Sequence, residues 1–261
     1  MKSNELLGVL EQVAPVALSD EFCKKCSFYD NSGIIIDGGD DIRGALFSLD
    51  LSPKAVEQAK KLGYNAIVTH HPAIYGGIER LNANQSPLAY ALYECVKRGI
   101  TVISMHLNFD AAPRGIDYYL MRGVGGEQCK TLINLENGAY GRVYDLPPVT
   151  LGELAERVAR EFNTQRLIVY GDKNKTVGKA ASFCGAGCDD NTCRFAVENN
   201  ADAVISSDMP HHRIADFVGR GTGIILLTHY ASEAYGFGKI YKKIMDKLSV
   251  PSSFFCDGDL L

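Results

Sequence analysis

Short apolar runs alternate with longer stretches of mixed polarity along the first half of this 261-residue chain. The runs at 33–37, 44–50 and 65–69 have the length and apolar content of buried strands. The stretches between and after them have the polarity of amphipathic helices. This alternation of strand and helix favours a sheet with parallel strands that is covered by helices.

Two serine-proline pairs mark where helices begin in this half. Ser52-Pro53 and Ser86-Pro87 each combine a capping hydroxyl with a proline at the first helical position. The helices are expected to end at Gly63 and Gly99, because glycine is favoured just after a helix. A further amphipathic helix, capped by Ser3 or Asn4, is expected at the N-terminus.

The pattern changes between about 126 and 149. Two strand-like runs flank Asn137-Gly138, a hairpin signal, and Pro147-Pro148 ends this stretch. We place the seam between two α/β halves here, with a first half at 1–125 and a second at 126–261. In the second half Thr150 is expected to cap a helix over 153–162; further expected elements are strands at 166–170 and 179–184 and a helix at 191–199.

Two segments of the chain end in the same pattern of residue types. Each is an Arg-Gly pair, a short apolar run, a histidine and then a carboxylate four residues later: His106 with Asp110, and His229 with Glu233. An upstream phrase precedes each copy, at 65–71 and 202–208. The repetition predicts an internal duplication, although it has too few copies for a repeat architecture.

All six histidines of the chain fall within these phrases or directly after them; they are His70, His71, His106, His211, His212 and His229. Ligand sites in parallel α/β sheets lie beyond the carboxyl ends of strands, where these phrases end. Strand ends from both copies would project imidazoles and carboxylates into one cleft. Three histidines and two carboxylates suffice for two divalent ions, and this donor set suits zinc, iron or manganese.

Glycines and cysteines offer weaker signals. The Gly185-Ala-Gly187 turn follows a predicted strand and could present backbone N–H groups to a phosphate, although a plain tight turn is the more common reading. Cys23 and Cys26 have the spacing of half a zinc site or a redox pair. We interpret these two, and the cluster Cys184, Cys188 and Cys193, as structural or incidental thiols of a reduced compartment.

Composition narrows the function classes. The formal net charge of −4 argues against a nucleic-acid surface built on bulk positive charge. No apolar run approaches the roughly 18 residues of a membrane span, and the N-terminal residues do not read as a signal peptide. We therefore expect a soluble cytoplasmic protein without a membrane partner.

In its histidine-containing phrases the chain resembles the Ngg-one-interacting-factor-three family, whose members are also called GTP cyclohydrolase 1 type 2 homologs. The resemblance rests on the phrases at 69–72, 106–113 and 228–233, with 29–33 in support, and it extends over the whole chain. It implies two similar, intertwined α/β halves with mixed sheets, a dinuclear metal site in the cleft between them, and assembly into ring-like homohexamers.

The resemblance also implies roles for residues. The family's metal ligands correspond to His70, His71, Asp110, His229 and Glu233. His106 is expected behind the ligands, orienting one of them or moving a proton. His212 is expected to be the acid–base residue, whereas His211 is an extra neighbour. The phrase before them, 206–208, lacks the glycine usual in the family.

The function that follows is a dinuclear metal-dependent hydrolase similar to GTP cyclohydrolase 1 type 2. Metal-bound hydroxide would attack a small-molecule substrate, a nucleotide or related heterocycle, with Gly185 and Gly187 as substrate-binding candidates. The alternative is a non-enzymatic metal-binding scaffold or regulatory protein that acts through protein partners.

Overall fold

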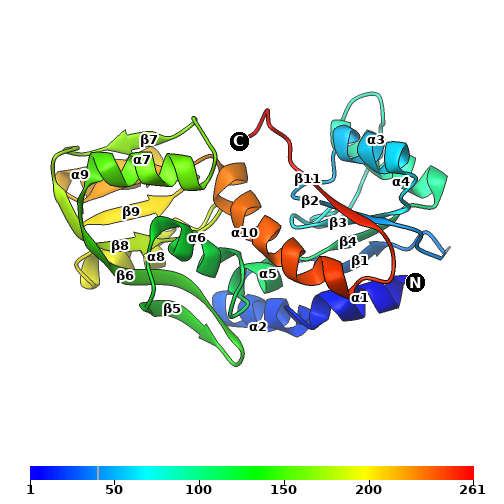
Figure 1. Cartoon of the computed structure of the whole chain (residues 1–261), viewed down its shortest axis with the longest axis horizontal. Helices are drawn as coiled ribbons and strands as arrows, with labels where there is room; N and C mark the ends of the chain where they lie inside the picture. The colour runs from blue at the N-terminus through cyan, green and yellow to red at the C-terminus, as the bar shows by residue number, and fades with distance from the viewer. Residues whose placement is uncertain (40) are drawn as a thin grey trace. The chain divides into compact units, whose positions relative to one another are not determined.

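The computed structural model describes residues 1–39 and 41–261, and the chain forms two compact units (Figure 1). The first unit contains Met1–Ala112 and Phe237–Cys256. The second contains Pro113–Gly236 and Asp257–Leu261. Each unit holds one sheet, so the predicted fold of two α/β halves with mixed sheets is confirmed.

The first unit is built on a five-stranded sheet in the order β1-β4-β3-β2-β11. Four neighbouring strands are parallel and β1 runs antiparallel at one edge. The strands are β1 (Gly33–Ile36), β2 (Ala45–Ser48), β3 (Ala66–Thr69), β4 (Thr101–Ser104) and β11 (Ser252–Phe255). Every residue of β2, β3 and β4 is buried, as expected for parallel strands covered on both faces.

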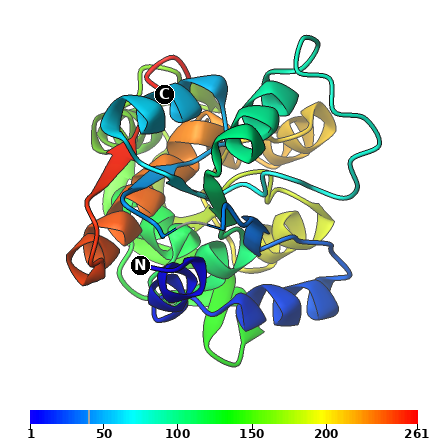
Figure 2. The same ribbon diagram turned by 90° about the vertical axis from the view of Figure 1, so that its right-hand side faces the viewer.

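Helices lie on both sides of this sheet. In Figure 2, α3 and α4 lie on one side and α1 and α2, in dark blue, on the other. The helices are α1 (Ser3–Glu11), α2 (Val16–Cys26), α3 (Pro53–Leu62), α4 (Pro87–Arg98) and α5 (Leu107–Ala111). On the side of α3 and α4, the core includes Leu46, Val56, Ile67, Leu92 and Val102, all buried.

The helix ends predicted from the serine-proline pairs are confirmed. The Ser52 and Ser86 hydroxyls accept hydrogen bonds from backbone N–H groups three residues on, and Gly63 and Gly99 close the helices in the left-handed conformation. The predicted cap of the first helix is wrong. Helix α1 begins at Ser3 after Lys2, and the Ser3 hydroxyl instead donates to Asp37 at 3.3 Å.

The second unit is built on a six-stranded sheet in the order β5-β6-β8-β9-β10-β7. Its strands are β5 (Cys129–Leu135), β6 (Gly138–Thr150), β7 (Ile168–Tyr170), β8 (Thr176–Ser182), β9 (Ala203–Ser206) and β10 (Gly223–Leu226). Its helices are α6 (Ile116–Val124), α7 (Leu151–Glu161), α8 (Asp190–Glu198) and α9 (His211–Gly219). The predicted hairpin and the Thr150 cap are confirmed, but the turn lies at Glu136 and Asn137, because Gly138 already belongs to β6 and pairs with Leu135.

The proline pair does not end the hairpin strand as the sequence suggested. Strand β6 continues through Pro147 and Pro148 to Thr150. Its pairing with β8 shifts register between Asp145 and Val149, so the prolines lie at an irregularity of the ladder. Proline is tolerated at such a position because no regular ladder hydrogen bond needs its missing N–H.

The duplication is visible in strand pairing. In the first unit β3 pairs with β4 in parallel, with Ala66 opposite Thr101 and Thr69 opposite Ser104. In the second unit β9 pairs with β10 in parallel, with Ala203 opposite Gly223 and Ser206 opposite Leu226. Each pair is flanked by a parallel strand on one side and an antiparallel strand on the other. The two predicted repeats therefore occupy equivalent strands of two related sheets.

One long helix, α10 (His229–Ile244), begins in the second unit and ends in the first. It is followed by a short 3-10 turn (Met245–Lys247) and by β11. Among the helices of the described residues, none is long and apolar enough to cross a membrane.

Candidate metal centre

The first group of candidate ligands lies beyond β3 and β4 in the first unit. His70 follows the last residue of β3 and is fully buried. Its Nδ1 lies 2.9 Å from the carbonyl oxygen of Met105, and its Nε2 lies 3.5 Å from Asp110 Oδ1. Because a carbonyl can only accept, the Nδ1 atom carries the proton. In the neutral ring this leaves the Nε2 lone pair directed to the side of Asp110.

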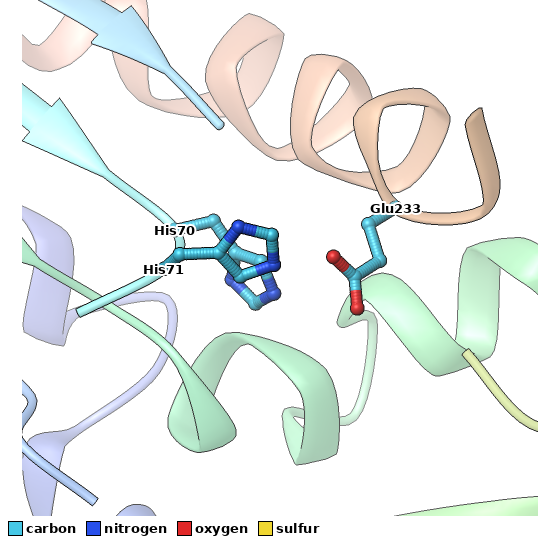
Figure 3. A group of neighbouring side chains, drawn as sticks. All are labelled: His70, His71 and Glu233. Atoms are coloured by element: carbon cyan, nitrogen blue, oxygen red, sulfur yellow. The ribbon is translucent and has the colours of Figure 1, made fainter. Parts of the chain in front are cut away.

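His71 is held in a similar way by a carboxylate. Its Nδ1 lies 2.7 Å from Asp50 Oδ1, and its carbonyl accepts a hydrogen bond from the Thr69 hydroxyl. The rings of His70 and His71 have centroids 5.0 Å apart, and Figure 3 shows the two side by side in the segment after β3. A carboxylate on Nδ1 fixes the tautomer and strengthens Nε2 as a ligand.

His106 forms a third imidazole–acceptor pair, with Asp30. The two lie 2.8 Å apart through Nδ1 and Oδ1, and His106, His70 and Asp110 can place one ligand atom each within 4.8 Å of one another. Burial alone would raise the pKa of Asp30. Hydrogen bonds and charge from His106, with hydrogen bonds from Ser19 and Ser32, instead hold that pKa well below its ordinary value.

The second group lies beyond β9 and β10 in the second unit. His229 begins α10, and its Nδ1 lies 2.6 Å from Asp208 Oδ2. The i, i+4 spacing brings Glu233 to the same face of the helix, so His229 Nε2 lies 3.2 Å from Glu233 Oε2. The Glu233 side chain is almost fully buried and points away from α10 in Figure 3.

Two further features of the second unit border Glu233. The buried Cys184 sulfur lies within 4.8 Å of a Glu233 carboxylate oxygen. Gly185 has a φ of +56°, and a Cβ added there would lie 2.1 Å from Glu233 Oε1. Its N–H donates to Ser232 Oγ, and Gly187 N–H donates to the Cys184 carbonyl. Both glycine N–H groups are thus engaged within the unit.

The remaining histidines lie at the start of another helix. His211 and His212 are the first two residues of α9, and both are exposed. The pKa of Asp190 is lowered mainly by its ion pair with Arg213, and the charge of His212 adds a smaller effect. An exposed imidazole at a helix N-terminus is open to solvent and to ligands.

The sequence did not indicate Asp50 or Asp208 as partners of ligands, and it treated Cys184 as structural. All three lie just beyond parallel strands, as the histidines do: Asp50 beyond β2, Asp208 beyond β9 and Cys184 beyond β8. Their position after a strand is a signal that could have found them. Their role depends on which strands are neighbours, which the residue pattern alone does not give.

The donor set fits divalent metal ions. It combines imidazole Nε2 atoms with largely buried carboxylates, and the Nδ1 atoms of His70, His71 and His229 all lie on acceptors. This arrangement is typical of histidines that bind zinc, iron or manganese. The residues that the structure describes therefore include groups able to hold a metal ion.

Comparison with known proteins places the chain in a family. A family model described as Duf34/NIF3 (NGG1p interacting factor 3) matches residues 1–256. The chain belongs to the Duf34/NIF3 family. A protein from Clostridium perfringens named GTP cyclohydrolase 1 type 2 homolog is 26% identical over 260 residues, which covers 97% of this chain and 95% of that protein.

Other members of the Duf34/NIF3 family support the same assignment. The NIF3 homolog of Schizosaccharomyces pombe is 25% identical over 98% of this chain and 91% of its own length. A crystal structure of a Bacillus cereus protein related to NIF3 has a TM-score of 0.83 at 18% identity, with 98% of this chain and 96% of that chain covered. The fold is therefore that of other NIF3-related proteins.

Proposed function

We propose that this Duf34/NIF3 protein is a dinuclear metal-dependent hydrolase. Its ligands would be His70, His71, Asp110, His229 and Glu233, and its ions zinc, iron or manganese. The observation that carries the proposal is the Nδ1 pattern. Each of the three proposed histidine ligands has Nδ1 on an oxygen acceptor at 2.6–2.9 Å, so Nε2 is the ring atom that would bind a metal.

The chemistry of such a centre matches a hydrolase. Two bound divalent ions would lower the pKa of coordinated water from 15.7 to about 7 and so supply a nucleophile at neutral pH. The relatives named GTP cyclohydrolase 1 type 2 homolog support a nucleotide or related heterocycle as substrate. Opening the imidazole ring of guanine would release formate, which gives a measurable product.

The chain's own residues would orient ligands and move protons. Asp50 and Asp208 hold the tautomers of His71 and His229. His106 pairs with the acidic Asp30 and would exchange a proton with substrate or water through Nε2. The exposed His212 is the proposed acid–base residue for the leaving group. Gly185 and Gly187 could contact a phosphate only if the hydrogen bonds that their N–H groups now donate were broken.

A second function has support in the family's name. NGG1p interacting factor 3 describes an interaction, and the Schizosaccharomyces pombe relative carries the same name. In this alternative the chain is a metal-binding scaffold or regulatory protein that acts through protein partners.

We also propose the homohexamer implied by the resemblance, for which light scattering after gel filtration should give six times the chain mass.

Metal content and formate release test the proposal together. Protein purified without chelator should hold about two metal ions per chain by elemental analysis, and His70→Ala and Glu233→Ala should hold less. Metal-loaded wild type should release formate from GTP faster than either variant. Fewer than about one ion per chain would refute the dinuclear centre. If all three proteins release formate at the same rate, the cyclohydrolase hypothesis is rejected and the scaffold hypothesis remains.

A further inference from the structure

Two buried cysteines of the second unit lie next to each other outside the proposed ligands. Cys188 and Cys193 have sulfur atoms 3.7 Å apart, and their exposed fractions are 4% and 9%. Cys188 lies just before α8, and Cys193 lies in its first turns. Both thiols are free. A disulfide bond is about 2.05 Å long, so the sulfurs need approach by only about 1.6 Å to form one.

The surroundings make one thiol of the pair the more acidic. A hydrogen bond from Cys188 lowers the pKa of Cys193, burial opposes this, and the charge of Arg213 lowers it further. The hydrogen bond and burial together raise the pKa of Cys188. Arg213 is itself fixed by an ion pair with Asp190, at 2.7 Å. A thiolate beside an arginine and a second thiol is the arrangement found in redox-active cysteine pairs.

The backbone just before Cys188 lies against Glu233. Gly185 is so close that an added Cβ would lie 2.1 Å from Glu233 Oε1 and 3.2 Å from His229 Nε2. The Gly185 carbonyl accepts a hydrogen bond from Ser207, and its N–H donates to Ser232. On the other side, α8 is anchored at its start by the capping box of Asp189 and Thr192. Movement of Cys188 towards Cys193 would therefore displace the segment 184–188.

We propose that Cys188 and Cys193 form a reversible redox site, which a peroxide oxidises to a disulfide. We further propose that this disulfide weakens metal binding by His229 and Glu233; this second part rests on the proposed function. Hydrogen peroxide fits as oxidant because it is nearly as small as water and both thiols are largely buried. The site would link the metal centre to the oxidation state of the cell.

The chemistry is balanced with one peroxide per pair. The Cys193 thiolate attacks a peroxide oxygen, the O–O bond breaks, and the released hydroxide takes a proton to become water. The Cys188 sulfur then attacks the Cys193 sulfenic acid, the S–O bond breaks, and a second water leaves. Two thiols are oxidised by two electrons and hydrogen peroxide is reduced to two waters. A dithiol such as dithiothreitol reverses the change by exchange.

Mass spectrometry of the full-length protein tests the redox site. After treatment with hydrogen peroxide and alkylation, the tryptic peptide 180–194 should lose two hydrogens, and dithiothreitol should restore them. Cys184→Ser should retain this loss, and Cys193→Ser should abolish it. Cys23 and Cys26 provide an internal comparison, because a bond between them would join two tryptic peptides. Peptide 180–194 that stays fully reduced while other cysteines oxidise would overturn the proposal.

Zinc affinity, measured by competition with a chromophoric chelator, tests the link to the metal site. Oxidised wild type should bind zinc about 10–100-fold more weakly than reduced wild type, because displaced partners of ligands typically have effects of this size. Peroxide-treated Cys188→Ser should bind zinc as tightly as reduced wild type does. Equal affinities of oxidised and reduced wild type would overturn the link. If the reduced protein binds no zinc, the proposed function fails, whereas peptide mapping still decides the redox site.

Discussion

Gly185→Ala should displace a candidate metal ligand by a distance that the structure fixes. The added Cβ would lie 2.1 Å from Glu233 Oε1, whereas real Cβ contacts essentially never fall below 3.0 Å. The carboxylate oxygen, as the end of a flexible side chain, is therefore expected to move by about 0.9 Å. Metal–ligand distances vary by only about 0.2 Å in working sites. We expect zinc affinity to fall at least about tenfold, by analogy with perturbed outer-shell partners.

The same substitution also strains the backbone, and a matched variant separates the two effects. Gly221 has a φ of +75°, with no atom within 4 Å of an added Cβ. Gly221→Ala should lower the free energy of unfolding by about 1–2 kcal/mol through left-handed strain alone. Gly185→Ala should add about 1–3 kcal/mol for overpacking beside a buried carboxylate.

Urea unfolding of the metal-free proteins and zinc competition on the folded proteins measure the two effects. Gly221→Ala should lose stability and keep wild-type zinc affinity. Gly185→Ala should lose both. If Gly185→Ala binds zinc as tightly as Gly221→Ala does, then Glu233 either is not a ligand or has room to move, and the reasoning is refuted.

Three other substitutions give independent results. Asp208→Asn should weaken zinc binding about 10–100-fold, because it removes the carboxylate on His229 Nδ1. Asp30→Asn should lower the free energy of unfolding by about 2 kcal/mol at pH 7. Because the folded-state pKa of Asp30 is lowered, its contribution is present above the unfolded pKa of about 3.9 and is lost as pH falls further. The difference in urea unfolding should therefore shrink below about pH 4. Arg142→Met should cost about 3–5 kcal/mol in the same assay, because it removes the guanidinium that lies 2.8 Å from the buried Asp117 carboxylate.

Exposed groups supply controls for Asp208→Asn and Arg142→Met. Asp216 and Arg220 form an i, i+4 ion pair on the surface of α9. Asp216→Asn should leave zinc affinity unchanged, and Arg220→Met should cost less than about 1 kcal/mol. A loss for Arg142→Met no larger than that for Arg220→Met would contradict the buried pair's importance. If the difference in unfolding free energy between wild type and Asp30→Asn grows at low pH, the lowered folded-state pKa of Asp30 is contradicted.

Helix ends were predictable because their chemistry is local. Ser52 and Ser86 cap helices by bonding to N–H groups three residues away, and Gly63 and Gly99 end them through a conformation that glycine adopts without strain. None of these interactions depends on distant parts of the chain. The prediction that Ser3 caps the first helix is wrong because its hydroxyl donates a hydrogen bond to Asp37, a partner remote in sequence.

The position of the histidines just beyond strands was also predictable, whereas the groups that hold them were not. A histidine after a buried run marks a strand end, and parallel strands collect such ends at one edge of a sheet. Asp50 reaches His71 only because β2 and β3 are neighbours with Ser48 opposite Thr69. Strand order and register of this kind are set by packing of the whole unit. The same holds for Pro147, whose place in β6 depends on a shift in pairing with β8.

The place of β11 in the first sheet has a consequence for synthesis on the ribosome. Strand β2 is made early, yet one of its two neighbours is β11, whose residues pair with it from Ser252 opposite Ala45 to Phe255 opposite Ser48. Until about 200 further residues have been made, the backbone of one side of β2 lacks its native partner. An unpaired strand edge is a site of aggregation, so the nascent chain depends on β11 to protect β2.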